Sequence, residues 1–254
     1  MCRQIAYLGP PVTLESLVLA PRHSLLHQSY RPKFQRHGVV NADGFGCGWF
    51  RPEVRPEPAV YRRDKPIWSD RTFASIAGVI STGAFLAAVR DATTGAATEE
   101  SSTAPFTASG WLFAHNGLFR GFDGPLGVTL RKKLSDHRLG SISGTSDSEV
   151  IFGLILDRLE EGATPGEALA WAVALCLELT TGAFNFLLMD SSSIYATACG
   201  DSLYVLDDGT AIPRGVVVAS EPFDEDPAWT PVPDSSAVQV TGGEVAITPL
   251  KEHE

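Results

Sequence analysis

The chain begins Met-Cys-Arg-Gln, and residues 4–8 behind the cysteine have the composition of a short strand. Chain ends usually fray unless such a strand ties them into the fold. Initiator methionine is normally removed before a residue as small as Cys2, which then becomes the first residue of the mature protein. The sequence therefore favours a fold that holds the start of the chain, thiol included, in a defined place.

A cysteine at the start of a chain carries both groups of a nucleophilic catalyst. A thiol attacks carbonyl carbon as the thiolate, and free cysteine titrates near about 8.5. A terminal amine titrates at about 7.7–8.0, so near neutral pH part of it is unprotonated and can act as the general base. The alternative is that Cys2 is incidental, because a single motif is only a hypothesis.

Composition indicates one acidic globular domain. The 254 residues are 44% hydrophobic and 20% charged, with a net charge of −10. We expect a single domain over residues 2–254, with Met1 removed. The sequence shows neither the positive stripe of a nucleic-acid binder nor an apolar run long enough for a membrane span. No secretory signal is apparent, so we expect a cytoplasmic protein that binds neither nucleic acid nor membrane.

The four cysteines have no spacing typical of a metal framework, and we expect no metal site. They are Cys2, Cys47, Cys176 and Cys199. Reduced thiols in a cytoplasmic protein are the simplest interpretation.

Alternate glycines mark a predicted strand over residues 44–50. The run Gly-Phe-Gly-Cys-Gly-Trp-Phe resembles a dinucleotide-binding loop only superficially, because such a loop must open a helix. Here the proline-rich residues 51–56 follow, which we expect to form a loop. Glycines inside a strand indicate close approach of another segment. We therefore expect this strand to run beside a tightly packed site.

Predicted strands lie on both sides of a central pair of helices. One helix is expected to begin near residue 146 and the other near residue 165, with shorter helices over residues 13–20 and 69–77. Strands are expected over residues 4–8, 44–50, 81–90, 110–117, 182–190, 193–199, 202–206, 215–220 and 236–247. Residues 221–235 are expected to form a surface loop. This order suggests an α+β fold in which two antiparallel sheets pack face to face with helices outside.

Three further motifs, far apart in the sequence, resemble a known family when they are taken together with Cys2. They are Arg-Asp-Ala-Thr-Thr-Gly at residues 90–95, Phe-Ala-His-Asn-Gly at 113–117 and Thr-Ser-Asp-Ser-Glu-Val at 145–150. The four features, in this order, resemble the class II glutamine amidotransferases, which are N-terminal-nucleophile (Ntn) hydrolases. The resemblance covers residues 2 to about 205. It implies a four-layer αββα sandwich of two mainly antiparallel sheets flanked by helices.

The resemblance implies a catalytic role for three residues. Cys2 is the nucleophile, and its α-amine moves the proton. The Asn116 side-chain N–H and the Gly117 backbone N–H hold the oxyanion of the tetrahedral intermediate. No metal or organic cofactor is needed. The ordinary alternative for Asn116 and Gly117 is a hairpin turn.

The resemblance also implies a site for the glutamyl end of a γ-glutamyl substrate. Arg90 binds the α-carboxylate through paired hydrogen bonds, and Asp147 accepts from the α-ammonium. Thr93 and Thr94 complete this substrate-binding set. The ordinary alternatives are a surface ion pair for Arg90 and a helix cap for Asp147. Many glutaminases have an aromatic residue and a histidine where this chain has Asp91 and Thr94, which argues against glutamine as the preferred substrate.

Further motifs resemble a narrower group, the γ-glutamyl hercynylcysteine sulfoxide hydrolases of ergothioneine biosynthesis. They are Met-Cys-Arg-Gln at residues 1–4, Asp-Gly-Phe-Gly-Cys-Gly-Trp-Phe at 43–50, Arg-Asp-Ala-Thr at 90–93, Ala-Ser-Glu-Pro-Phe-Asp at 219–224 and Trp-Thr-Pro-Val-Pro at 229–233. This resemblance implies release of glutamate and hercynylcysteine sulfoxide. An aromatic wall would suit the trimethylammonium group of that substrate, and Trp49, Phe119 and Trp229 are candidates. Ordinary packing is the alternative for each.

Three functions follow as hypotheses. The first is a free-standing γ-glutamyl amide hydrolase with a small-molecule substrate, since no synthase-like segment follows the motifs. The second is a glutaminase subunit that supplies ammonia to a separate synthase. The third is a non-catalytic binding domain in which Cys2 is incidental. The oligomeric state is left open by the sequence.

Overall fold

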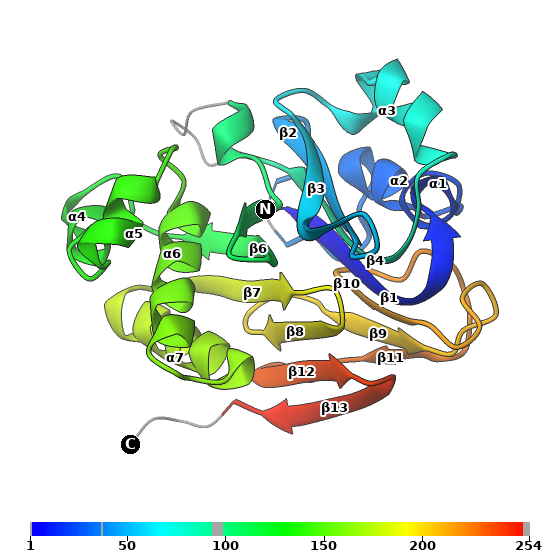
Figure 1. The fold of residues 1–254 in the computed structure, drawn as a ribbon. Coiled ribbons are helices and arrows are strands. Elements are labelled where there is room, and N and C mark those ends of the chain that lie inside the picture. The colour runs from blue at the N-terminus through cyan, green and yellow to red at the C-terminus, as the bar shows by residue number, and fades with distance from the viewer. Residues whose placement is uncertain (1, 37, 93–98, 251–254) are drawn as a thin grey trace.

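The computed structural model describes residues 2–36, 38–92 and 99–250, and two antiparallel sheets form its centre (Figure 1). In spatial order, the seven-stranded sheet contains β11 (Trp229–Pro231), β9 (Tyr204–Asp207), β10 (Val216–Ala219), β1 (Arg3–Thr13), β4 (Ser81–Arg90), β2 (Gly44–Arg51) and β3 (Arg55–Arg63). The six-stranded sheet contains β13 (Glu244–Pro249), β12 (Ser236–Thr241), β8 (Ser193–Ala198), β7 (Gly182–Met189), β6 (Trp111–Phe119) and β5 (Phe106–Ala108).

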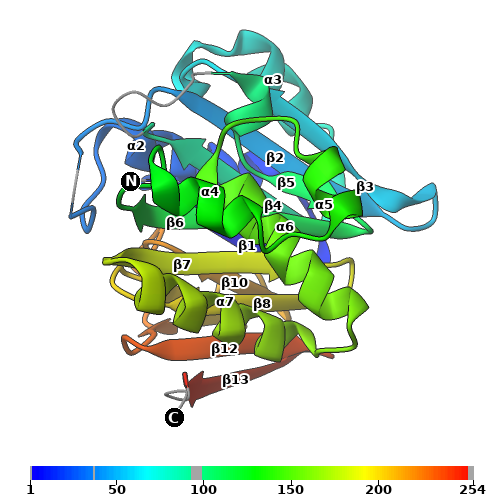
Figure 2. The ribbon, with the colours of Figure 1, turned by 90° about the vertical axis from the view of Figure 1, so that its left-hand side faces the viewer.

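Helices cover the outer face of each sheet. They are α1 (Leu14–Val18), α2 (Leu25–Tyr30), α3 (Arg71–Ala77), α4 (Pro125–Arg131), α5 (Asp136–Ser141), α6 (Asp147–Glu160) and α7 (Pro165–Leu179). Figure 2 shows α6 and α7 lying over the six-stranded sheet, while α1, α2 and α3 lie beyond the other sheet. Short 3-10 turns occupy Ile67–Ser69 and Glu100–Ser102. No helix in the described part of the chain is long and apolar enough to span a membrane.

Three separate apolar clusters hold the four layers together. In β1, alternate side chains point to opposite faces. Ile5 and Tyr7 therefore pack with Phe73 of α3, whereas Ala6 packs between the two sheets. The third cluster joins α6 and α7 to the six-stranded sheet and includes Phe113. These clusters confirm the expected αββα sandwich, with each sheet buried on both faces.

The start of the chain is held inside the seven-stranded sheet. β1 pairs with β4 on one side, where Arg3 lies opposite Val89, and with β10 on the other, where Ile5 lies opposite Ala219. Both neighbours supply backbone hydrogen bonds, so the first strand cannot fray as a free end would. The expectation of an anchored chain start is confirmed.

The glycines of β2 lie where another segment approaches closely, as their alternation predicts. A Cβ atom on Gly46 would overlap the carbonyl oxygen of Ala104, and one on Gly48 would lie 2.6 Å from Leu112. Residues 103–105, which follow the 3-10 turn, therefore pack directly on β2. Residues 103 and 104 of this segment reappear below as part of a pocket wall.

Several sequence predictions about individual elements were wrong. The expected loop at residues 51–56 contains the start of β3, whose Pro56 and Pro58 are tolerated because β3 is the edge strand of its sheet. The expected strand at residues 236–247 is a hairpin of β12 and β13, which turns at Gly242 and Gly243 with φ of 62° and 82°. The expected surface loop at residues 221–235 contains β11 and begins at a fully buried residue, Glu221.

Candidate active site

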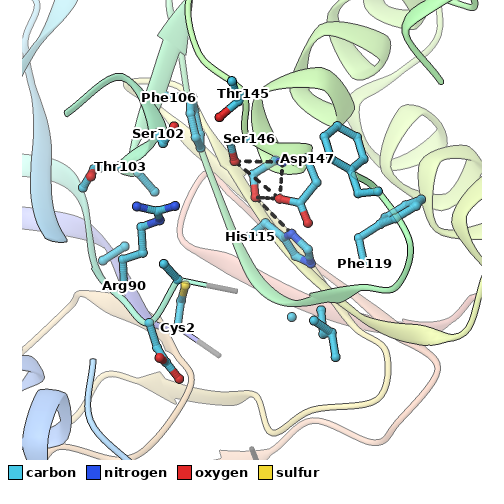
Figure 3. Close-up of a pocket in the computed structure, with 18 of the residues that line it drawn as sticks. Cys2, Arg90, Ser102, Thr103, Phe106, His115, Phe119, Thr145, Ser146 and Asp147 are labelled. Atoms are coloured by element: carbon cyan, nitrogen blue, oxygen red, sulfur yellow. Dashed lines mark hydrogen bonds between the residues drawn. The ribbon is translucent and has the colours of Figure 1, made fainter. Parts of the chain in front are cut away.

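A pocket of about 410 Å³ opens at the end of the seven-stranded sheet where β1 begins and β4 ends. Its wall includes Cys2, Arg90, Gly117 and Asp147, four of the residues predicted from the sequence (Figure 3). Because Arg3 lies opposite Val89 in the antiparallel pair, Cys2 and Arg90 are brought to the same sheet end. A volume of this size suits a small molecule.

The two charged residues predicted from the sequence, Arg90 and Asp147, lie on opposite walls of the pocket, which Asp91, Arg120 and Asp123 also line. Figure 3 shows Arg90 beside Cys2, while Asp147 faces them from the start of α6. A cation and an anion separated by a cavity can bind the two charges of an amino acid from opposite sides. Two other predicted substrate-binding residues, Thr93 and Thr94, lie outside the described residues.

Asp147 is fixed by the cap of α6. Ser146 is the N-cap residue, and its Oγ accepts from the backbone N–H of Ser148 at 3.2 Å. Asp147 Oδ1 accepts from the same N–H at 2.6 Å and from Ser148 Oγ at 3.0 Å. At the N-terminal end of a helix, the backbone dipoles also favour a charged carboxylate. The carboxylate therefore has a defined orientation at the pocket wall.

Glu149 explains why this motif contains a second carboxylate. Its Oε1 accepts from the backbone N–H and Oγ of Ser143, and its Oε2 accepts from the N–H of Gly144 at 2.7 Å. Glu149 thus fastens the loop that leads into α6 and carries the pocket residues Thr145 and Ser146. Its function is in positioning that loop, which the sequence motif alone does not reveal.

His115 supports Asp147 from the neighbouring strand β6. Its Nε2 lies 3.0 Å from the carbonyl oxygen of Ala183, so Nε2 must carry a hydrogen. Its Nδ1 lies 3.1 Å from Ser148 Oγ, which also contacts Asp147. One hydroxyl hydrogen cannot serve both neighbours. The hydroxyl therefore donates either to His115 Nδ1 or to Asp147 Oδ1, and both contacts fix the position of Ser148 Oγ.

Gly117 can only be glycine in this arrangement. A Cβ atom there would overlap the carbonyl oxygen of Ala183 and the His115 ring. The close packing explains the glycine of the His-Asn-Gly motif without reference to a turn, because β6 continues to Phe119. The predicted use of its N–H for an oxyanion remains a prediction.

Asn116 lies on the opposite side of β6, as alternation along a strand requires. Its fully buried side chain reaches a polar cluster behind the pocket instead of the pocket wall. Its Nδ2 donates to Asp201 Oδ2 at 3.0 Å and lies 3.5 Å from Ser220 Oγ, while its Oδ1 accepts from Arg3 at 3.4 Å. An oxyanion role would use the N–H not given to Asp201, and it too remains a prediction.

Cys2 is the one cysteine of the four that lines this pocket. The other three, Cys47, Cys176 and Cys199, are buried. Burial raises the pKa of each of these three thiols, and the nearby Asp147 carboxylate adds to the effect at Cys176. They are therefore poor nucleophiles at neutral pH. The partly exposed Cys2 is the chemically accessible thiol.

One of the three proposed aromatic residues lines the pocket. Phe119 does so, together with Phe106 and Phe122. Trp49 and Trp229 do not line the pocket, and both pack against the apolar cluster that contains Phe73 of α3. The Trp229 ring meets Phe223 edge-on, and its Nε1 donates to Asp224 at 2.7 Å. Both tryptophans anchor core and loop segments, which is their ordinary alternative.

The buried charges behind Cys2 were not predicted from the sequence. Arg3, Asp201 and Glu221 all have side chains with 0% exposure. The signal was present, because Arg3 follows the predicted nucleophile and occupies a strand otherwise apolar from Ile5 to Leu8. A charge in a buried strand needs a partner. The sequence could not identify that partner, since Asp201 lies 198 residues away.

Comparison with known proteins gives consistent similarities. The model of a family described as class-II glutamine amidotransferases matches residues 24–210. A γ-glutamyl-hercynylcysteine sulfoxide hydrolase from Mycolicibacterium smegmatis is 42% identical over 251 residues, which cover 98% of this chain and 100% of that protein. The protein of the same name from Mycobacterium tuberculosis is 37% identical over 250 residues, covering 98% and 97%.

A solved structure from Silicibacter pomeroyi has the same arrangement of layers. It is described as a glutamine aminotransferase class-II domain protein, and it matches with a TM-score of 0.70 and 26% sequence identity. The match covers 98% of this chain and 99% of the other. The similarity thus includes both sheets and their covering helices.

Proposed function

The chain belongs to the class-II glutamine amidotransferase family, and from this premise we propose that it hydrolyses a γ-glutamyl amide. The substrate is γ-glutamyl-hercynylcysteine sulfoxide, on which the relatives named above act according to their names. The products are glutamate and hercynylcysteine sulfoxide, and the reaction is a step of ergothioneine biosynthesis. One observation carries the proposal, namely that Cys2, Arg90 and Asp147 line a single pocket.

Binding of the glutamyl end precedes chemistry. Arg90 pairs with the α-carboxylate, and Asp147 accepts from the α-ammonium, with Thr93 and Thr94 as further contacts. These opposed charges fix the glutamyl chain at its α-carbon. Its γ-amide carbon is then directed toward Cys2 on the Arg90 side of the pocket. Such alignment converts an encounter between two reactants into a step within one complex.

The reaction then passes through a thioester. With Met1 removed, the free α-amine of Cys2 takes the thiol proton, and sulfur forms a bond to the γ-carbon. Asn116 and Gly117 donate hydrogen bonds to the resulting oxyanion. When the C–N bond of the substrate breaks, the α-ammonium of Cys2 returns the proton to the leaving nitrogen. Water activated by the same amine attacks the thioester, which releases glutamate and restores the thiol.

The remaining parts of the proposal concern the whole protein. Residues 2–254 act as a single domain on a small molecule. The four free thiols suit a reducing compartment, which supports a cytoplasmic location. The aromatic side chains of Phe106, Phe119 and Phe122 suit a substrate that carries a cation at its far end.

Replacement of the nucleophile tests the proposal. We expect Cys2→Ala to abolish glutamate release while its circular dichroism spectrum and melting temperature match those of the wild type. The matched control is Cys176→Ala, which removes a buried thiol in the α7 core and should retain turnover. Retained activity in Cys2→Ala would contradict the mechanism.

A substrate panel separates the proposed hydrolase from a glutaminase. Glutamate release should be measured with glutamine, γ-glutamylcysteine and γ-glutamyl-hercynylcysteine sulfoxide. We expect the last to have the highest kcat/KM. A preference for glutamine that a second protein stimulates would instead support an ammonia-supplying subunit. Absence of turnover with all three, without labelling of Cys2 by a glutamine-like electrophile, would support a binding domain.

A further inference from the structure

Arg3 is a fully buried cation that directly follows the nucleophile. Its Nε donates to the carbonyl oxygen of Cys2 at 2.7 Å. Its Nη2 donates to Asp201 Oδ2 at 2.8 Å, and its Nη1 lies 3.3 Å from Glu221 Oε1. Both of these acidic side chains have no exposure to solvent. A guanidinium in such a place uses its planar fork of donors, which a lysine could not reproduce.

The ion pair between Arg3 and Asp201 holds both ends of the Asn116 side-chain amide. Arg3 Nη2 donates to Asn116 Oδ1 at 3.4 Å, and Asn116 Nδ2 donates to Asp201 Oδ2 at 3.0 Å. A flipped amide would set its NH₂ group against the guanidinium and its oxygen against the carboxylate. The pair therefore selects one orientation of Asn116. It contacts the predicted nucleophile and the predicted oxyanion donor at once.

Asp201 is itself anchored to the six-stranded sheet. Asn185 lies opposite Asn116 in the pairing of β6 and β7. Its Nδ2 donates to the carbonyl oxygens of Asp201 and Ser202, at 2.9 and 3.2 Å. The remaining carboxylate oxygen, Oδ1, accepts from the N–H of Ser202 at 2.9 Å. Asp201 thus links β7 of the six-stranded sheet to Arg3 at the start of the seven-stranded sheet.

Stability alone does not account for this arrangement. A buried ion pair is often no more stabilising than apolar residues of the same volume, because both charges lose their hydration. What the pair supplies here is geometry at a chain start. After loss of Met1, no preceding residue holds the backbone of Cys2. The hydrogen bond from Arg3 Nε to the Cys2 carbonyl oxygen then helps to fix that backbone.

We propose that the Arg3–Asp201 clamp, defined as the ion pair between these two side chains, positions the Cys2 backbone and the Asn116 amide for reaction. The proposal rests on the function proposed above. Arg3 and Asp201 do not line the substrate pocket, so they are positioning residues. Their loss should lower kcat and leave KM nearly unchanged. Misplacement of a reacting group by about 1 Å costs on the order of 100-fold in rate.

Asp201→Asn and Arg3→Lys test the clamp with little change in volume. We expect each variant to lose about 10- to 100-fold in kcat, with KM within about twofold of the wild type. Intact mass must first show that Met1 is removed from every variant. The double variant should lose no more than the worse single variant, because the two residues act as one unit. Full additivity, or a rise in KM at unchanged kcat, would overturn the proposal.

A second, partly buried ion pair provides the control. Arg138 of α5 is 3% exposed and pairs with Asp157 of α6 at 3.4 Å. Asp157 lies ten positions beyond Asp147 along α6, or about 15 Å along the helix axis. Asp157→Asn should lower the melting temperature and leave kcat unchanged. If Asp201→Asn affects kcat only as much as Asp157→Asn does, the clamp has merely a structural role.

Labelling of Cys2 tests the clamp independently of the natural substrate. The probe is 6-diazo-5-oxo-L-norleucine, an electrophilic glutamine analogue, with the modified residue located by mass spectrometry. We expect Asp201→Asn to slow the maximal labelling rate about tenfold at an unchanged half-saturating concentration. If the wild type hydrolyses no γ-glutamyl amide but shows this dependence, the proposed substrate fails and the clamp stands. The clamp is overturned if neither Asp201→Asn nor Arg3→Lys changes the labelling rate, or if the wild type is not labelled.

Discussion

Asp147 is oriented before any ligand arrives, because both Ser148 donors hold its Oδ1. No hydrogen bond from the described residues reaches its Oδ2, which is left for a ligand in the pocket. His115 extends this support through Ser148 Oγ. A carboxylate that is already oriented in this way loses little conformational entropy when it binds a cation.

Asp147→Asn is predicted to weaken substrate binding. A hydrogen bond to a charged partner is worth about 1.5–3 kcal/mol, so KM should rise about 10- to 100-fold while kcat changes much less. Steady-state kinetics with γ-glutamyl-hercynylcysteine sulfoxide measures both. A matched control is Asp136→Asn in α5, an acidic residue outside the pocket wall. An unchanged KM would show that the α-ammonium binds elsewhere.

Single residues were predictable where a short motif contains them. Cys2, Arg90, Gly117 and Asp147 were all found from short motifs, and the structure brings them to one pocket. The partners of Arg3 were not predictable, because hydrogen bonds between distant segments leave no local pattern. The same limit applies to Asn116, whose orientation depends on contacts that only the folded chain supplies.

At the scale of elements, β2 shapes the pocket because its glycines have no side chains. Its glycines allow Thr103 and Ala104 to lie close to the strand, and these two residues form part of the pocket wall. A side chain on that face would push the wall toward the cavity. The alternation of glycine in β2 therefore shapes the site without contributing any functional group to it.

Gly46→Ala is predicted to destabilise the protein and to disturb the pocket. Overpacking of a tight contact costs about 1–3 kcal/mol, and the carbonyl of Ala104 cannot rotate away as a flexible side chain could. Urea unfolding should show the loss, with a lower kcat/KM. Gly166→Ala in α7 is the control. No atom lies within 4 Å of the added Cβ, and alanine favours the helix by up to about 1 kcal/mol. Equal stability of the two variants would contradict the close approach.

Long or strongly patterned elements were predictable, whereas several of the short ones were not. The two central helices carry apolar residues at helical spacing, and α7 has a full capping box at Thr164 and Glu167. By contrast, α2, α4 and α5 have six or seven residues each, too few to show a period. The β12–β13 hairpin was missed although Gly242 and Gly243 form a typical turn pair. The β-branched residues on both sides, such as Val240 and Val245, made the segment resemble one long strand.

The whole molecule depends on buried charges that join distant segments. Glu221 follows β10 and accepts from the backbone N–H groups of Lys33 and Phe34, at 2.8 and 2.9 Å. It also contacts His23 Nε2 at 2.7 Å and Arg3. This one carboxylate thus ties the start of the chain, the region around α2 and the end of β10. Its partners belong to the seven-stranded sheet and to the segment around α2.

Acid should destabilise the protein in part through Glu221. Burial by itself raises the pKa of this carboxyl, but the hydrogen bond from His23, those from Lys33 and Phe34 and the charge of Arg3 together lower it. A carboxyl whose pKa is lower in the folded state contributes its full stability above the unfolded value of about 4.3. That contribution is lost as pH falls through the lower folded value. Unfolding free energy should therefore decline between about pH 5 and pH 3.

Glu221→Gln is predicted to change both the level and the slope of this decline. At pH 7 the variant should be less stable by about 3 kcal/mol. It leaves Arg3 with one buried carboxylate, that of Asp201, instead of two, and it leaves His23 and the backbone donors of Lys33 and Phe34 without a charged acceptor. Between pH 5 and pH 3 it should lose less stability than the wild type, because the titrating group is gone. Urea unfolding at pH 7, 5 and 3 measures both effects. Glu161→Gln, at a surface pair with Arg158, should follow the wild type. Parallel curves for Glu221→Gln and the wild type would show that other carboxylates govern the acid response.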